Sequence, residues 1–212
     1  MTSLCSAATL AGEAATLAGR ASRDHGPSST GFSHDFQWAP RSYDEGQIGL
    51  HFGLSQPLLL GGFNVAADAH LGRWVFEYSH GMTLDYNRLE RAMLTAAERE
   101  AGLDLDSPWT TGFGLGIRVL DELYPMVEFK AHRYTARIGD ATERYTTISI
   151  GPALAHRLFL YDGLFVNTYL RYWPNLWTSR RNDEVHFDSN LTHETVDLGF
   201  FGNLSIGYAV DL

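Results

Sequence analysis

The chain has 212 residues, 44% of them hydrophobic, which suffices for one domain with a sizeable core, and an all-β barrel of this length needs no second domain. Its formal net charge of −9, without a basic stripe, argues against a nucleic-acid partner. The single cysteine, Cys5, excludes an internal disulfide, and a chain with only one lysine, Lys130, lacks the lysine-rich coat of an ordinary soluble domain.

Residues 1–44 are predicted to form an N-terminal tail that is loose or partly helical. The segment Ala7–Gly12 recurs as Ala14–Gly19, and the chain then becomes rich in Ser, Gly, Pro and charged residues. An export signal is not evident, because Glu13 interrupts the only apolar stretch that could serve as its core. We therefore expect the folded domain to comprise residues 45–212.

Apolar and polar residues alternate with a period of two over most of this domain, which predicts β-strands. The expected strands are 46–56, 62–71, 74–86, 108–120, 124–137, 144–155, 163–173 and 195–212. No apolar run approaches the ~18 residues of a membrane-spanning helix, whereas a strand crosses a membrane with ~9–11 alternating residues. The pattern therefore excludes a helical membrane protein but not a membrane barrel.

The connections between these strands differ in length. Long ones follow the third and seventh strands, at 87–107 and 174–194, and tight ones follow the second and fourth. Within the first long connection the apolar period changes to that of a helix at 88–101, and Gly102 is placed to end it. We expect one short helix in this surface loop.

The last strand ends in a recognisable pattern. Its final eight residues run polar, any, Gly, any, any, apolar, any, apolar, with Ser205, Gly207, Val210 and Leu212 at the fixed positions. This resembles the last strand of bacterial outer-membrane β-barrels, in which the pattern is the signal read by the insertion machinery. That family usually ends in Phe or Trp, whereas this chain ends in Leu.

The resemblance covers about residues 46–212 and names no subfamily. It implies a closed, antiparallel, up-and-down transmembrane barrel of about eight strands in the bacterial outer membrane. The implied partners are outer-membrane lipids, lipopolysaccharide and the barrel-insertion machinery, and the implied state is a monomer.

The two faces of the strands suit opposite environments. Gly, Ser, Thr, Asn and Asp dominate the polar face and suit the narrow interior of an eight-stranded barrel. Aromatic residues near strand ends suit the girdles at membrane interfaces, and they include Trp74, Tyr86, Trp109, Tyr124 and Tyr172. The residues expected to point inward are Asp68, Glu77, Arg118, Glu128, Lys130, His132 and Arg171, together with Asp85 and Asp197. Because an unpaired buried charge is costly, we expect them to pair into a polar plug.

Glu184, His186 and Ser189 form the nearest approach to a catalytic set. A carboxylate that orients a histidine beside a serine is the arrangement that acyl hydrolysis needs. Small outer-membrane lipid A deacylases carry a compact His-any-Ser-Asn motif on a strand, whereas here one extra residue intervenes, in an expected loop. A hydrated polar loop is the favoured interpretation, so no catalytic residue is assigned.

His51, His70 and His132 share the expected lumen with carboxylates, but their spacing matches no recognised metal site. Residues of this kind serve more often as hydrogen-bond partners. We expect no metal and no cofactor.

Three hypotheses remain open from the sequence. The leading one is a non-enzymatic outer-membrane barrel with a structural or surface-interaction role, a plugged lumen and recognition through loops 87–107 and 174–194. The alternatives are a lipid A-type acyl hydrolase acting at the barrel rim and a soluble lipocalin-like carrier whose apolar face encloses a hydrophobic ligand. The direction in which Phe52, Phe113 and Ile206 point separates the first from the last.

Overall fold

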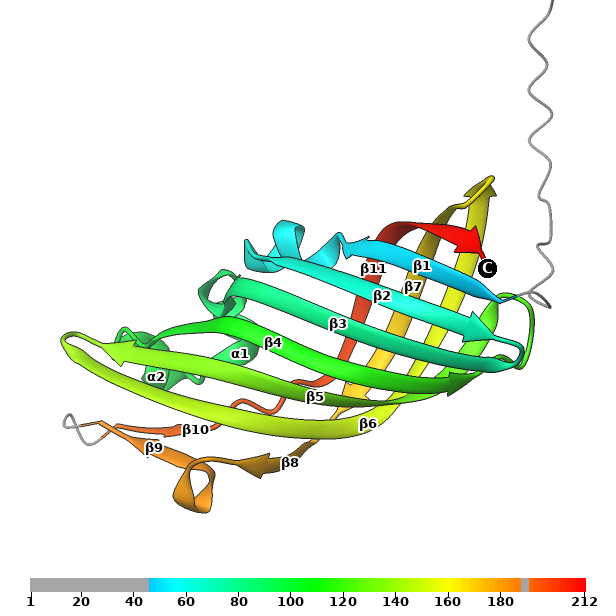
Figure 1. Ribbon diagram of the computed structural model, residues 1–212. Coiled ribbons are helices and arrows are strands. Elements are labelled where there is room, and N and C mark those ends of the chain that lie inside the picture. Colours follow the sequence, from blue (N-terminus) through cyan, green and yellow to red (C-terminus); the bar gives the residue numbers. More distant parts are fainter. Residues whose placement is uncertain (1–45, 188–190) are drawn as a thin grey trace, which may run out of the picture. The chain divides into compact units, whose positions relative to one another are not determined.

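The computed structural model describes residues 46–187 and 191–212, so the expected tail lies outside the described residues. Eight antiparallel strands form the barrel (Figure 1): β1 (Gln47–Gly53), β2 (Phe63–Leu71), β3 (Trp74–Asp85), β4 (Asp104–Ile117), β5 (Leu123–Ile138), β6 (Ala141–Tyr161), β7 (Leu164–Trp173) and β11 (Gly199–Asp211). Each pairs with the strand before it in this series, and β11 closes the barrel on β1. The predicted fold class, a closed eight-stranded up-and-down barrel, is confirmed.

The apolar residues of the strands point outward. Phe52, Phe113 and Ile206 are 38%, 61% and 38% exposed, whereas inward neighbours such as His51 and Ser205 are buried. This orientation contradicts the lipocalin-like alternative, which requires the oily face inside. A closed sheet satisfies every backbone donor and acceptor without an edge, which is what a lipid environment demands.

One end of the barrel carries short turns, and the other carries the long connections. The short turns are residues 72–73, 118–122 and 162–163. We call the opposite end the outer end, following the asymmetry of such barrels. Its connections contain η1 (Gln56–Leu60), η2 (Tyr86–Leu89), α1 (Glu90–Met93), α2 (Ala96–Glu100), β8 (Asn175–Thr178), η3 (Arg181–Asp183), β9 (Glu184–His186) and β10 (Thr192–Glu194). In the described residues no helix is long and apolar enough to span a membrane.

The outer end departs from the predictions in two connections. The first strand stops at Gly53, and the short helix η1 begins three residues later at Gln56. Pro57 lacks the N–H that a strand pair would need but suits the first turn of this helix, which Gly61 ends with φ 70°. The expected helix at 88–101 is interrupted at Leu94, which is extended, and Thr95 then caps α2. A threonine hydroxyl offers its own hydrogen bond to the chain and so favours a new helix start.

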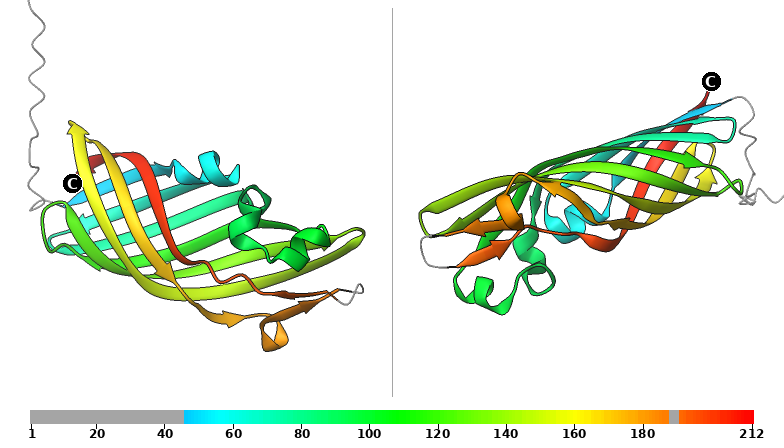
Figure 2. Two further views of the ribbon diagram at one scale, coloured as in Figure 1. Left: turned by 180° about the vertical axis from the view of Figure 1, so that it is seen from behind. Right: turned by 90° about the horizontal axis from the view of Figure 1, so that it is seen from below.

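The last long connection also contains more structure than expected. β8 lies along the outer half of β6, with Thr147 opposite Thr178, and β9 pairs with β10. Figure 2 shows the β5–β6 hairpin running beyond the barrel beside these strands. The two loops and the hairpin share a hydrophobic cluster, which we call the outer cap: Leu84, Tyr86, Leu94, Leu103, Leu105, Tyr134, Ala136, Tyr145, Val185, Phe187 and Val196.

Two of the five expected girdle aromatics do not face outward. Trp74, Trp109 and Tyr172 are exposed on the outer wall, but Tyr86 and Tyr124 are buried. Tyr86 lies beyond the end of β3 and packs in the outer cap. Tyr124 lies two residues before Met126 on β5, so it shares the inward face of that strand.

Candidate functional site in the barrel lumen

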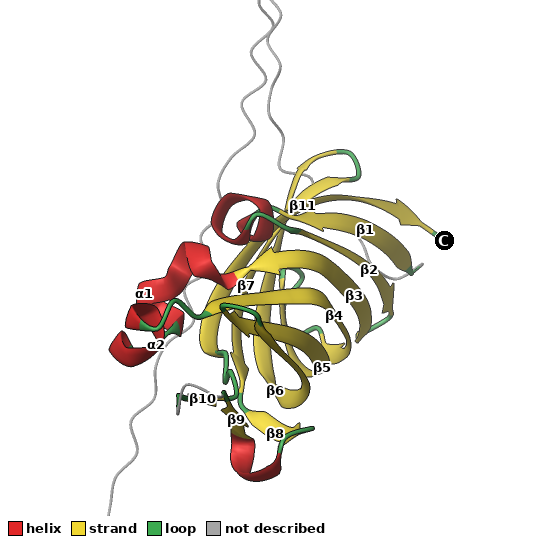
Figure 3. Ribbon diagram, turned by 90° about the vertical axis from the view of Figure 1, so that its left-hand side faces the viewer, coloured by secondary structure: helices red, strands yellow, loops and turns green. Residues whose placement is uncertain are grey.

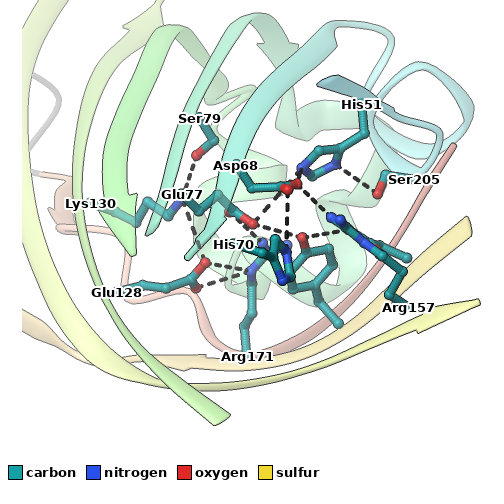
Figure 4. Close-up of polar contacts among 12 residues, drawn as sticks. His51, Asp68, His70, Glu77, Ser79, Glu128, Lys130, Arg157, Arg171 and Ser205 are labelled. Carbon is teal, nitrogen blue, oxygen red and sulfur yellow. Dashed lines mark hydrogen bonds and ion pairs between the residues drawn. The ribbon is translucent and has the colours of Figure 1, made fainter. Parts of the chain in front are cut away.

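Charged side chains from five strands meet inside the barrel (Figure 4). Arg157 Nη2 lies 2.6 Å from Asp68 Oδ2. Arg171 reaches two carboxylates, with Nε 3.0 Å from Glu128 Oε2 and Nη2 3.3 Å from Glu77 Oε1. Each of these side chains is almost completely buried. Bringing such charges out of water is favourable only when they pair this closely, so the network depends on all of its members.

The remaining cation completes the balance of charge. Lys130 Nζ donates to Ser79 Oγ and lies 3.8 Å from Glu128 Oε1. The network thus holds three carboxylates and three permanent cations: Asp68, Glu77, Glu128, Arg157, Arg171 and Lys130. With neutral histidines its net charge is zero, which is the condition under which a buried cluster avoids an uncompensated charge.

Aromatic and amide side chains fix the network in place. The Tyr169 hydroxyl donates to Glu77 Oε2 at 2.7 Å, and Trp173 Nε1 donates to Glu128 Oε2 at 2.7 Å. The Arg171 guanidinium lies 3.8 Å above the centre of the Tyr169 ring. These contacts limit each charged group to one position, as a solid plug requires.

Gly112 and Gly114 lie on the inward face of β4, where there is no room for a side chain. A Cβ at Gly112 would meet the Lys130 side chain, and one at Gly114 would meet Met126. The glycines therefore make room for the inward side chains of the neighbouring strand β5.

The lumen histidines act as hydrogen-bond partners. His51 Nδ1 lies 3.0 Å from Ser205 Oγ and its Nε2 3.3 Å from Asp68 Oδ2, while His70 Nε2 lies 3.3 Å from Asp68 Oδ1. His132 Nδ1 lies 2.8 Å from Thr110 Oγ1. In the part of the chain that the structure describes, no group of three or more His, Cys, Asp or Glu side chains is placed to hold a metal ion.

The charged residues expected to point into the lumen differ from those found there, and the differences lie at the ends of the strands. Asp68, Glu77, Glu128, Lys130, His132 and Arg171 lie buried in the lumen. Arg118 is half-buried just beyond β4, where it donates to the Gly72 carbonyl, and neither Asp85 nor Asp197 is buried. They lie at or beyond strand ends, where the inward alternation stops.

Arg157 was missed, because the sixth strand was expected to end at residue 155. β6 continues to Tyr161, and Arg157 follows the inward Ala153 and Ala155 by the same step of two. Continuing that alternation by one step would have found it.

A cavity of about 270 Å³ lies on the outer side of the network. Its floor includes Glu77, Lys130, His132 and Arg171, and its apolar wall includes residues of η1, α1 and the start of β11. Figure 3, which faces the outer end, shows the helices at this end of the barrel. The lumen thus has two parts, an ion-paired inner plug and a partly apolar outer cavity.

The expected hydrolase residues lie elsewhere, on the β9–β10 hairpin. His186 Nε2 is 3.4 Å from Glu184 Oε2, and His186 Nδ1 is 3.1 Å from Thr192 Oγ1, with the His186 side chain 69% exposed. Ser189 belongs to residues 188–190, which lie outside the described residues. The structure therefore brings together two of the three residues, on an exposed strand pair.

The residues of the C-terminal pattern lie on β11 and at its end. Ser205 is buried against His51, and a Cβ at Gly207 would come within 2.5 Å of the His51 Cβ and the Phe165 ring. Val210 and Leu212 are exposed on the outer wall. The glycine is needed here for the close approach of β1 and β7.

Glu98 and His193 tie the two long loops together inside the outer cap. His193 Nδ1 lies 2.5 Å from Glu98 Oε1, and the Tyr145 hydroxyl lies 2.9 Å from His193 Nε2. Because a carboxylate only accepts, His193 donates from Nδ1, and the neutral ring then accepts from Tyr145 at Nε2. Glu98 also accepts from the Thr95 backbone N–H at 2.6 Å in a capping box.

This tie predicts an acid-sensitive cap. Burial raises the pKa of Glu98, but hydrogen bonds from His193 and Thr95 outweigh it and hold the pKa below its ordinary value. A carboxyl with a lowered folded pKa stabilises above its unfolded pKa of about 4.3 and loses that contribution as the pH falls below it. We expect the cap of the native protein to become protease-sensitive in that acidic range.

Glu98→Ala is expected to lower the free energy needed to open the cap at neutral pH by about 1–3 kcal/mol, because it leaves His193 and the Thr95 N–H without their acceptor. Limited proteolysis of the folded barrel measures this as an increase of at least about fivefold in the cleavage rate of loops 87–107 and 174–194. Glu100→Ala, on the exposed face of the same helix, is the matched control. Equal rates for the two variants would contradict the tie.

Comparisons with known proteins found similar structures at low sequence identity. No protein-family model and no curated protein matches the chain. A major outer membrane protein from Thermus thermophilus is similar with a TM-score of 0.46 at 11% identity, over 78% of this chain and 99% of that one. Neisserial surface protein A gives 0.41 at 14% identity, over 79% and 95%, and Ail of Yersinia pestis gives 0.41 at 12% identity, over 78% and 99%.

These similarities leave the subfamily unidentified. The molecule's own features support a membrane barrel: eight strands closed into a barrel by the pairing of β1 with β11, an apolar outer wall with aromatic residues near strand ends, and a polar interior. A wall of this kind is stable in hydrocarbon and unstable in water. The chain therefore forms a small, closed, eight-stranded β-barrel whose outer wall suits a membrane.

Proposed function

We propose that this barrel is a non-conducting outer-membrane protein with a structural and surface-interaction role, in which the loops around the outer cap recognise a partner. The observation that carries the first part is the neutral ion-paired network that fills the lumen, from Arg157 and Asp68 to Arg171 and Glu128. A permeating ion would have to break pairs whose members then stand unpaired in a low-dielectric space. The plug therefore opposes conduction.

The loops that enclose the outer cap supply the surface for recognition. Loops 87–107 and 174–194 share one hydrophobic cluster and the Glu98–His193 tie, so they present a fixed surface and lose little entropy on binding. Binding and catalytic residues are concentrated on loops held by a rigid scaffold. The proposed partners are outer-membrane lipids and lipopolysaccharide for the mature barrel and the barrel-insertion machinery during its assembly, with the barrel itself a monomer.

Arginines above the outer girdle support the lipopolysaccharide proposal. Arg133 stands opposite the girdle residue Trp109, and Arg180 donates to Glu143 at 2.5 Å and to the Arg144 carbonyl at 2.7 Å. Guanidinium groups bind phosphate in a bidentate manner, and this group of side chains has three cations, Arg133, Arg144 and Arg180, and one carboxylate, Glu143. Its place above the girdle corresponds to the depth of anionic lipid head groups.

Recording current from the purified barrel in planar lipid bilayers tests the plug. We expect no unitary steps above the leak of the bare bilayer, because every permanent charge in the lumen is paired. The double variant Arg171→Ala/Glu128→Ala removes a cation and a carboxylate together and is expected to produce steps without leaving a net charge. Stable steps from the native protein would refute the proposal.

A further inference from the structure

The outer cavity lies beside an interruption in the barrel wall. β1 pairs with β11 only as far as Gly53 and Ser205, whereas β11 continues to Gly199 against β7. Over residues 199–203, the described strands pair with β11 on one side only. The cavity is lined from both edges of this interruption, by Gln56 and Leu59 of η1 and by Phe200 and Asn203 of β11.

The exposure of the lining residues shows where the cavity opens. Leu59 is 51% exposed and Phe200 is 73% exposed, although both line the cavity. Phe200 stacks on the girdle residue Tyr172 with ring centres 4.4 Å apart. The opening is thus at the level of the outer aromatic girdle, where membrane amphiphiles place their polar ends.

Three buried polar atoms on the cavity wall make no hydrogen bond within the described residues. They are His132 Nε2, Asn203 Oδ1 and Gln56 Oε1, and the His132 and Asn203 side chains are more than nine-tenths buried. An unpaired buried polar atom costs about 1–3 kcal/mol, so the site favours a partner for each. The two amide oxygens accept only, and the partner must therefore bring a donor.

The charges below the cavity exclude a charged partner. Lys130, Arg171 and Glu77 line its floor, and each already pairs within the network, whose total charge is zero. A carboxylate or an ammonium group added here would be an uncompensated buried charge. A hydroxyl donates its one hydrogen to an amide oxygen such as Asn203 Oδ1 and accepts from His132 when the ring carries its proton on Nε2, so one hydroxyl satisfies two of the three atoms.

The volume of the cavity limits the size of the apolar part of its ligand. A cavity of 150 Å³ holds one benzene ring, so 270 Å³ holds about ten non-hydrogen atoms. The wall away from the floor is apolar, with Leu60, Met93 and Phe201 among its residues. A medium-length alkyl chain satisfies both limits.

We propose that the outer cavity binds an uncharged, hydroxyl-bearing amphiphile with a medium-length alkyl chain, taken from the membrane through the interruption between η1 and β11. The polar end lies against His132 and Asn203, and the chain lies along the apolar wall. This goes beyond the proposed function and does not depend on whether the plug blocks ions, because conduction is measured separately.

The test uses the full-length barrel in phosphatidylcholine nanodiscs and a photoreactive decanol that carries a diazirine in its chain. We expect the cross-links, mapped by mass spectrometry, to fall on cavity residues such as Met93 and Phe201. Unlabelled decanol is expected to compete at a concentration at least about tenfold lower than decanoate or decylamine, because either charged head would be unpaired. Equal competition by decanoate would overturn the uncharged head.

Two adjacent alanines on β2 supply a matched pair of variants. Ala66 is buried and lines the cavity, whereas Ala67 is exposed on the outer wall. Ala66→Leu is expected to lower cavity cross-linking at least about tenfold by filling the space, and Ala67→Leu to leave it unchanged. Cross-links spread over the outer wall and insensitive to Ala66→Leu would overturn the site.

Asn203→Leu keeps the proposal testable if Ala66→Leu does not fold, as judged by heat-dependent gel migration. It removes one acceptor while keeping an apolar side chain of similar size. In this variant, unlabelled decanol is expected to compete with the photoreactive decanol about fivefold to tenfold less well than in the native protein, because one hydrogen bond is lost. Unchanged competition by decanol would overturn the role given to this amide.

Discussion

Arg157→Met is expected to destabilise the barrel by about 3–5 kcal/mol, because it removes the cation that lies 2.6 Å from Asp68 and leaves a buried carboxylate uncompensated. Arg157 is completely buried, and its Nε also donates to Asn167 Oδ1 at 3.0 Å. Methionine preserves much of the apolar stem and the packing volume, so the loss of stability measures mainly the effect of removing the charge. Urea unfolding in phosphatidylcholine vesicles, followed by tryptophan fluorescence, measures it.

Two further variants separate the ion pair from packing. Arg144→Met changes an exposed arginine of the same strand and is expected to lie within about 0.5 kcal/mol of the native protein. Arg157→Met/Asp68→Asn removes both charges and is expected to recover roughly half of the loss or more. A double variant as unstable as Arg157→Met would mean that shape, and not charge, makes this site important.

The sequence was sufficient to predict the face on which most strand residues lie. Alternation with a period of two placed Phe113 outside and Glu128 inside, because neighbouring side chains of a strand must point to opposite faces. The same rule places Tyr124 inside, where it is buried, although its residue type suits a girdle. Residue type is the weaker guide, since an aromatic ring packs as well in a lumen as in lipid.

The pairing of the lumen charges could not be predicted. Asp68 on β2 and Arg157 on β6 are 89 residues apart and meet across the lumen. Alternation gives the face of a residue but not its height along the barrel axis, which is set by strand tilt and register. The set of inward charges could therefore be predicted in part, whereas its partners needed the structure.

The short elements and contacts of the outer end could not be predicted from the sequence for a related reason. β8 pairs with β6 through residues near Thr147 and Thr178, and its four residues are too few to show alternation. His193 and Glu98 likewise come from different loops, 95 residues apart. Short elements whose stability depends on distant partners leave little local signal.

Phe113→Arg is expected to destabilise the barrel in vesicles by about 2–4 kcal/mol, because it places a cation near the middle of the hydrocarbon layer. Phe113 is 61% exposed and lies on β4 midway between Trp109 and Ile117, with Tyr78 and Phe129 opposite it on the two neighbouring strands. On a wall that faced water, the same substitution would change stability by no more than about 0.5 kcal/mol. Urea unfolding in vesicles distinguishes the two environments.

Val119→Arg provides the depth control for this prediction. Val119 is 56% exposed and lies beyond the end of β4, in the turn at the inner end. Because the penalty for arginine falls to about 0–1 kcal/mol near the interface, this variant should unfold close to the native protein. Equal stabilities for Phe113→Arg and Val119→Arg would mean that the outer wall meets one uniform solvent, and the membrane placement would then fail. A difference of the expected size shows that the wall spans a layer from which charge is excluded.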